Sequence, residues 1–164
     1  MKRSRYLYEK EYYEQAQNYV QVALQNFSDR STLAYASAVD LSGLIELDIN
    51  NPAKAFEMFE ASAKIREDLL PSGDPFLSAS QVNLGLACTE MGELEKAYQF
   101  LQKSIDIRLM ANSDRIGNSY SNMSSLLLRM GRADEAEEML KRCPSLENFT
   151  DETFLKTGNP RFSG

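Results

Sequence analysis

An internal repeat of about forty residues constrains the fold of this 164-residue chain more than any other feature of its sequence. Three segments align without gaps: "DLSGLIELDINNPAKAFEMFEAS", "VNLGLACTEMGELEKAYQFLQKS" and "SNMSSLLLRMGRADEAEEMLKRC". In this alignment Ala97 follows Ala55 by 42 residues, and Ala136 follows Ala97 by 39. A short repeat of this kind cannot bury its apolar surface alone, so successive copies are expected to stack.

Other positions keep the same offsets. They are the set Gly43, Gly85 and Ser124, and the set Asn50, Gly92 and Gly131. A fourth, partial copy is "EKEYYEQAQNYVQVAL", in which Ala16 precedes Ala55 by 39 residues. A larger residue follows each alanine by four positions, at Val20, Phe59, Leu101 and Leu140.

Each copy contains the signals of two helices. Gly92 and Gly131 come just after an apolar periodic run, where a left-handed residue ends a helix, and Asn50 is a common substitute for glycine there. Asn51-Pro52 and Asp74-Pro75 are typical of an N-cap followed by proline in the first turn. Period-two alternation is absent from the sequence, so no strands are expected. The predicted helices are 11–27, 31–48, 52–70, 75–91, 93–110, 115–130 and 132–142, with residues 1–9 as the end of a preceding helix.

Gly85 stands inside one of these helices, where glycine costs about 1 kcal/mol relative to alanine. We expect it to let the partner helix of its own repeat approach closely, with Ala97 doing the same from the other side. Gly85→Leu or Ala97→Leu should therefore overpack this contact and cost about 1–3 kcal/mol.

Composition excludes several classes of function. A net charge of −6 and a pI near 4.8 argue against a nucleic-acid or anionic-membrane surface. The absence of histidine removes the commonest general base and zinc ligand, and no nucleotide-binding fingerprint occurs. We expect no enzyme, metal or cofactor, and a cytoplasmic protein whose Cys88 and Cys143 serve in packing. Glu90, Glu93 and Glu95 are expected at a solvated turn.

The pattern Leu84-Gly85, Gly92, Ala97, Leu101 and Ser104 resembles the tetratricopeptide repeat (TPR). The text "IREDLLPSGDPFLSASQVNLG" resembles the longer repeats of kinesin light chains, and the departures are Ser42 before Gly43 and Ser124 in place of glycine. The resemblance implies an all-α fold, an α-α superhelix or TPR solenoid of antiparallel helix pairs. The expected division is a TPR array over 1–143, with a partial repeat at 1–27, full repeats at about 31–70, 75–110 and 115–142, and a tail at 144–164.

The ending "FLKTGNPRFSG" resembles the segment that follows the last repeats in fungal multidomain signalling proteins. On that interpretation the chain is the C-terminal repeat region of a longer protein.

The resemblance also implies that the first helix of each repeat lines a concave face. Asn83 and Asn122 occupy equivalent places there, where family members use asparagine to bond a peptide backbone. The expected partner-binding residues are Asn83, Asn122, Leu44, Leu86, Asn118 and Arg129. The same face is expected to include Asp40, Leu41, Leu47, Ala79, Val82, Glu90, Ser121 and Ser125.

The favoured function is a scaffold that binds a partner protein or peptide on this concave face. With Arg129 as the only basic residue there, a partner of basic or apolar character is expected, and a clamp for a C-terminal carboxylate is not. The alternative is a regulatory or sensor arm of a larger multidomain signalling ATPase or effector. Exposed apolar residues at a terminal repeat are expected to favour self-association.

Overall fold

The described residues form a row of helices that follows the predicted repeats. The computed structural model describes residues 2–143, with side chains from residue 10 onward. Within that range all regular elements are helical: α1 (Lys2–Asn26), α2 (Leu33–Asp48), α3 (Pro52–Leu69), α4 (Pro75–Glu90), α5 (Leu94–Met110), α6 (Ile116–Arg129) and α7 (Ala133–Lys141). The predicted limits agree within two residues except at the start of α1. The predicted tail, 144–164, lies outside the described residues.

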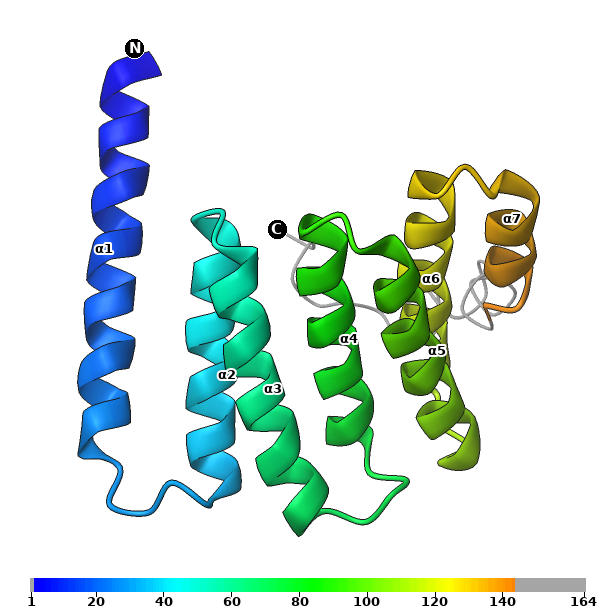
Figure 1. Cartoon of the computed structure of the whole chain (residues 1–164), viewed down its shortest axis with the longest axis horizontal. Coiled ribbons are helices and arrows are strands. Elements are labelled where there is room, and N and C mark those ends of the chain that lie inside the picture. The colour runs from blue at the N-terminus through cyan, green and yellow to red at the C-terminus, as the bar shows by residue number, and fades with distance from the viewer. Residues whose placement is uncertain (1, 144–164) are drawn as a thin grey trace, which may run out of the picture.

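Helix α1 differs from the prediction because it is continuous from Lys2. We expected residues 1–9 to end one helix and a second to begin at 11. No glycine or proline occurs between residues 2 and 26, so nothing in the backbone interrupts the helix. Figure 1 shows its N-terminal half rising past the ends of α2 and α3.

The helices stand side by side along the long axis of the molecule, and each packs against the next (Figure 1). In addition the backbones of α2 and α4 approach each other, as do those of α4 and α6, whereas the backbone of α3 makes no such approach to α1 or α5. Helices α5 and α7 are likewise apart. Since the first helices of the repeats lie closer together than the second helices, the array curves with α2, α4 and α6 on its inner side. This arrangement confirms the all-α superhelix of antiparallel helix pairs.

The turn inside each repeat has the predicted left-handed residue. Its φ angle is +66° at Asn50, +78° at Gly92 and +75° at Gly131. At each turn the next residue donates a backbone hydrogen bond to the carbonyl five positions earlier, for example Glu93 to Cys88 at 2.9 Å. These bonds satisfy carbonyls at the helix end, which explains why the motif recurs at the repeat offsets.

The two predicted N-caps have different outcomes. The Asp74 carboxylate accepts a bond from the Phe76 backbone N–H at 2.8 Å, as predicted. Asn51 makes no side-chain cap; instead its Nδ2 donates to the Glu46 carboxylate at 3.1 Å. The N-cap position and the first-turn proline are therefore confirmed at Asn51, but its side chain makes no cap bond, because its amide is bonded to the buried Glu46 carboxylate.

Close approach of the two helices explains the glycines. A Cβ placed on Gly85 would lie 3.0 Å from Leu101 Cδ2, and one on Gly43 would lie 2.6 Å from the Phe59 ring. Ala55 and Ala97 are fully buried on the opposite helices. The prediction of a small-residue crossing inside each repeat is confirmed.

Candidate functional site

The inner face of the array consists of the exposed sides of α2, α4 and α6. Equivalent residues of the three repeats form rows across these helices. One row is Leu41, Asn83 and Asn122; the next is Leu44, Leu86 and Ser125; a third is Asp48, Glu90 and Arg129. The face therefore changes from apolar on α2 to amide-rich and hydroxyl-rich on α6.

The predicted site residues all lie on these first helices. Asn83 and Asn122 are half-buried at equivalent positions of α4 and α6. Leu44 and Leu86 are 40% and 39% exposed, which is unusual for leucine in a packed helix pair, and Asn118 is exposed one turn before Asn122. The structure thus brings the predicted residues to one face.

Arg129 is not a free cation on this face. Its Nη1 lies 3.0 Å from Glu90 Oε1, and both side chains are about half exposed. An exposed ion pair contributes only about 0–1 kcal/mol, so a ligand carboxylate or ammonium can exchange with it. The pair joins equivalent positions of successive repeats and supports the alignment.

Three residues expected on the inner face lie elsewhere. Asp40 is 9% exposed and bonds Arg66 inside the helix stack. Leu47 packs against the core cluster of Ala55 and Phe59, and Val82 packs against the cluster of Met123 and Leu127. Since α2 and α4 each contact several helices, only one stripe of each reaches solvent, and these positions fall outside it.

An apolar pocket adjoins the inner face at the α1–α2 end. It has a volume of about 500 Å³, and Leu41 and Leu44 form one wall. The other wall is α1, whose Tyr12 and Tyr19 are 62% and 77% exposed. Asp48 lies at its border and supplies a negative charge. The pocket extends the leucine end of the inner face and adds the exposed rings of Tyr12 and Tyr19 to it.

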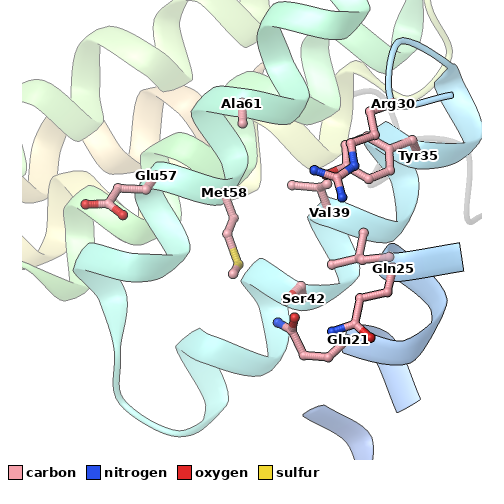
Figure 2. Close-up of a pocket in the computed structure, with 10 residues that line it drawn as sticks. Gln21, Gln25, Arg30, Tyr35, Val39, Ser42, Glu57, Met58 and Ala61 are labelled. Carbon is pink, nitrogen blue, oxygen red and sulfur yellow. The ribbon is translucent and has the colours of Figure 1, made fainter. Parts of the chain in front are cut away.

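A second pocket lies on the outer side, between α1 and α3, and Figure 2 shows the side chains around it. Its volume is about 380 Å³, with Val39 and Ser42 contributed by α2. Met58 reaches in from α3, and Gln21 and Gln25 from α1.

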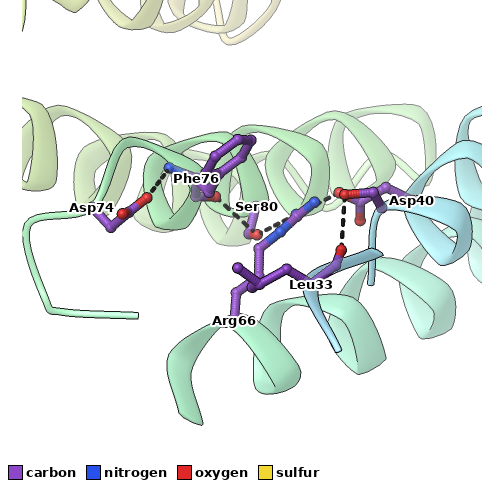
Figure 3. A network of polar contacts seen from close by, with 7 residues as sticks. Leu33, Asp40, Arg66, Asp74, Phe76 and Ser80 are labelled. Atoms are coloured by element: carbon purple, nitrogen blue, oxygen red, sulfur yellow. Dashed lines mark hydrogen bonds and ion pairs between the residues drawn. The ribbon is translucent and has the colours of Figure 1, made fainter. Parts of the chain in front are cut away.

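A buried polar network ties α2, α3 and α4 together (Figure 3). Arg66, 4% exposed, donates to Asp40 on one side and to Ser80 Oγ at 2.9 Å on the other. Its guanidinium carbon lies 5.7 Å from the centre of the Phe76 ring. Arg108, the equivalent residue 42 positions on, donates to Ser78 Oγ at 2.7 Å and to the Arg115 carbonyl. Burial lowers the pKa of Arg108, as does nearby Arg115. This network holds repeats in register, and it was not predicted.

Glu46 is the centre of a second buried polar network, which joins α1, α2 and α3. It is 2% exposed and accepts bonds from Lys54 at 2.7 Å, Asn51 at 3.1 Å and Gln17 at 3.2 Å. Burial alone would raise the pKa of Glu46, but the bonds from Lys54, Asn51 and Gln17 outweigh it and hold the pKa below its usual value.

The two cysteines and the acidic turn lie where the sequence placed them. Cys88 and Cys143 are buried, and burial raises the pKa of the Cys88 thiol, which disfavours its reactive thiolate. Glu90, Glu93 and Glu95 are exposed around the α4–α5 turn.

In the part of the chain that the structure describes, no three potential metal ligands of the His, Cys, Asp or Glu type come together. Over the same residues, no helix combines the length and hydropathy that a membrane span requires.

Comparison with known proteins agrees with this geometry. Residues 76–143 match the family model of the tetratricopeptide repeat. No curated protein sequence matches the chain. The TPR-like repeats of a protein described as a kinesin light chain, from Podosopora anserina, superpose with a TM-score of 0.68 at 18% identity, over 84% of this chain and 66% of that one.

Two further solved structures have the same fold. The TPR domain of Arabidopsis FLU gives a TM-score of 0.59 at 18% identity, over 74% of this chain and 95% of that one. Bacillus thuringiensis PlcR, solved with the peptide PapR7 and DNA, gives 0.70 at 16% identity, over 94% of this chain and 57% of that one. The chain thus spans less than two thirds of the kinesin light chain and PlcR structures. Residues 76–143 thus match the tetratricopeptide repeat, and the predicted α-α superhelix is the fold that the chain shares with these solved structures.

Proposed function

We propose that this tetratricopeptide-repeat array is a binding scaffold that holds an extended segment of a partner protein along its inner face. The observation that carries the proposal is the row Leu41, Asn83 and Asn122, which adjoins the apolar α1–α2 pocket. The two amides offer donors and acceptors to a peptide backbone, and the pocket offers an anchor for an apolar side chain.

Charge narrows the class of partner. Asp48 and Glu90 are exposed on the same row, and Arg129 pairs with Glu90 alone. A peptide with an apolar anchor and a basic residue beside it therefore complements this surface better than an acidic one does.

The fold is one that commonly mediates protein interactions, and the PlcR structure contains a peptide. These likenesses support a binding role without catalysis, metal or cofactor. The alternative role, as a regulatory arm of a larger signalling protein, would use the same face. We place the protein in the cytoplasm on the basis of its two buried cysteines.

The test begins with selection of peptides from a displayed random library by the purified chain. Fluorescence anisotropy then compares their affinity for the parent protein and for Asn83→Ala/Asn122→Ala. We expect at least about tenfold weaker binding, since two backbone hydrogen bonds are lost. Leu44→Ser should weaken peptides that carry an apolar anchor.

Gln99→Ala, an exposed amide on α5, is the matched control and should bind as the parent does. Circular dichroism should give the same helicity for all variants. Equal affinities of the parent and the double asparagine variant would reject the inner face as the binding site.

Self-association through the terminal repeat is a separate expectation. Tyr12, Tyr19 and Val22 are exposed on α1 and lie on one side of that helix. Sedimentation of Tyr12→Ser/Tyr19→Ser against the parent protein tests it: a concentration-dependent dimer that the variant abolishes is the expected result. A monomer at all concentrations would refute it.

A further inference from the structure

A cleft of about 690 Å³ lies on the outer side of the array, between α3 and α5. The backbones of these two helices stand apart, while the Phe56 ring of α3 and the Phe100 ring of α5 meet with their centroids 6.0 Å apart. Helix α4 lies between them and supplies Gln81 and Leu84. Phe100 and Lys103 come from α5. The remaining lining residues come from α3: Glu57, Glu60, Ala61, Ala63, Lys64, Glu67 and Asp68.

The rim of this cleft is acidic. Four carboxylates from α3 face two lysines, which leaves a net charge of −2 at neutral pH. The carboxylates are exposed, and among the described residues none of them takes part in a hydrogen bond or ion pair. A concave surface with one excess sign attracts an opposite charge.

The floor contains a polar group whose bonding capacity is unused. Gln81 is 7% exposed, and its Oε1 has no hydrogen-bond partner among the described residues. A buried amide oxygen without a hydrogen bond destabilises the folded chain. A ligand that brings hydrogen-bond donors into the cleft, and lets the amide reorient toward them, would recover that cost.

The equivalent groove one repeat earlier lacks these features. It is the pocket of Figure 2, in which Val39 stands at the position of Gln81, Met58 at that of Phe100, and Ala61 at that of Lys103. The buried glutamine of the floor is therefore particular to the α3–α5 cleft, and the equivalent position of the neighbouring groove is filled by an apolar side chain.

We propose that the cleft between α3 and α5 binds an arginine side chain from a basic segment of a partner protein. The Lys103 Nζ lies 5.7 Å from the centre of the half-buried Phe100 ring. The flat guanidinium of an arginine can replace this exposed ammonium on the ring and donate to Gln81 and to a rim carboxylate at once. Lysine offers a compact charge without the planar set of donors, so arginine is the better fit. The site lies on the opposite side of the array from Asn83 and Asn122.

The experiment is an NMR titration of the isotope-labelled chain with acetyl-GSRGRSG-amide, and with acetyl-GSKGKSG-amide as its lysine counterpart. We expect the arginine peptide to shift the Gln81 side-chain amide and backbone signals of α3 and α5. Its affinity should exceed that of the lysine peptide severalfold.

Variants distinguish binding in the cleft from non-specific attraction of a basic peptide to an acidic protein. Gln81→Val copies the neighbouring groove and should weaken the arginine peptide by about tenfold while leaving thermal stability unchanged or higher. Glu60→Gln/Glu67→Gln should also weaken it. Glu95→Gln/Asp134→Asn makes the same change in net charge away from the cleft and should have no comparable effect. Asn83→Ala/Asn122→Ala should bind the peptide normally.

Three results would overturn the proposal. The first is that the peptide leaves the NMR signals of Gln81 and Phe100 unshifted, and the second is that the arginine and lysine peptides bind with equal affinity. The third is that the cleft variants and the control variant lose the same affinity for the arginine peptide.

Discussion

The hydroxyl of Ser104 in α5 lies 2.8 Å from the hydroxyl of Ser119 in α6, and equally 2.8 Å from that of Ser78 in α4. Its equivalent one repeat earlier, Ser62, is also fully buried, yet its Oγ has no partner among the described residues. The counterpart of Ser78 there is Ala36, and the counterpart of Ser119 is Ser80, which bonds Arg66 instead. Two identical residues at equivalent positions therefore have opposite energetic roles.

Ser104→Ala should destabilise the protein by about 1–3 kcal/mol, because it leaves the buried Ser119 hydroxyl without its partner. Ser62→Ala should be neutral or stabilising, since it removes a buried hydroxyl that has no bond. Urea unfolding of both variants measures the difference. Equal effects of the two substitutions would contradict it.

Gly43→Ala should cost about 1–3 kcal/mol, because the added Cβ would lie 2.6 Å from the Phe59 ring. Gly73→Ala is the control: nothing lies within 4 Å of its Cβ, and its φ is not positive. Thermal unfolding should give a lower midpoint for Gly43→Ala than for Gly73→Ala. Equal midpoints would show that α2 and α3 can move apart to accommodate the added methyl group.

Arg66→Met should destabilise the chain by about 3–5 kcal/mol, because it leaves the Asp40 carboxylate buried without its cation. Arg66→Met/Asp40→Leu should recover much of that loss, since no charge then remains inside. A double-mutant cycle by urea denaturation measures the coupling. If the double variant is less stable than Arg66→Met, the ion pair is not the reason for the loss.

The Glu46 cluster should make stability depend on acidity. Its bonds hold the pKa of Glu46 below the value that an unfolded chain would give, about 4.3. The stabilisation is therefore complete above that unfolded value and is lost as the pH falls through the lower folded value. Glu46→Gln should flatten the stability profile between about pH 5 and pH 3. Exposed Glu95→Gln should leave the profile as in the parent, and a matching change there would refute the assignment.

The repeat could be predicted from the sequence because its markers have backbone causes. Gly92, Gly131 and Asn50 have positive φ, and Gly43 and Gly85 face the partner helix, so each position tolerates few residue types. The six predicted partner-binding residues also lie on the first helices of the repeats, because the helical period fixes which residues share a side, whereas Asp40, Leu47 and Val82 fall outside the inner face. Their part in binding stays a prediction.

The buried polar contacts were not predicted, because the periodicity of a helix indicates which side chains are buried but not which polar side chains bond to each other. Asp40 was expected on the inner face, whereas it bonds Arg66 from the next helix. The signal was present in the equivalence of Arg66 and Arg108 at the 42-residue offset. Two arginines kept at the same place in a helix pair indicate buried partners, and Ser78 and Ser80 supply them.

The unequal spacing of the two helix layers has a mechanical result. Because the backbones of α2, α4 and α6 lie closer together than those of α3 and α5, straightening the array would draw α3 toward α5, and tightening it would spread them. A partner segment bound between α3 and α5 would therefore increase the curvature of the array. The same movement would narrow the inner face, so binding on the outer side would change the space for a peptide on the opposite side.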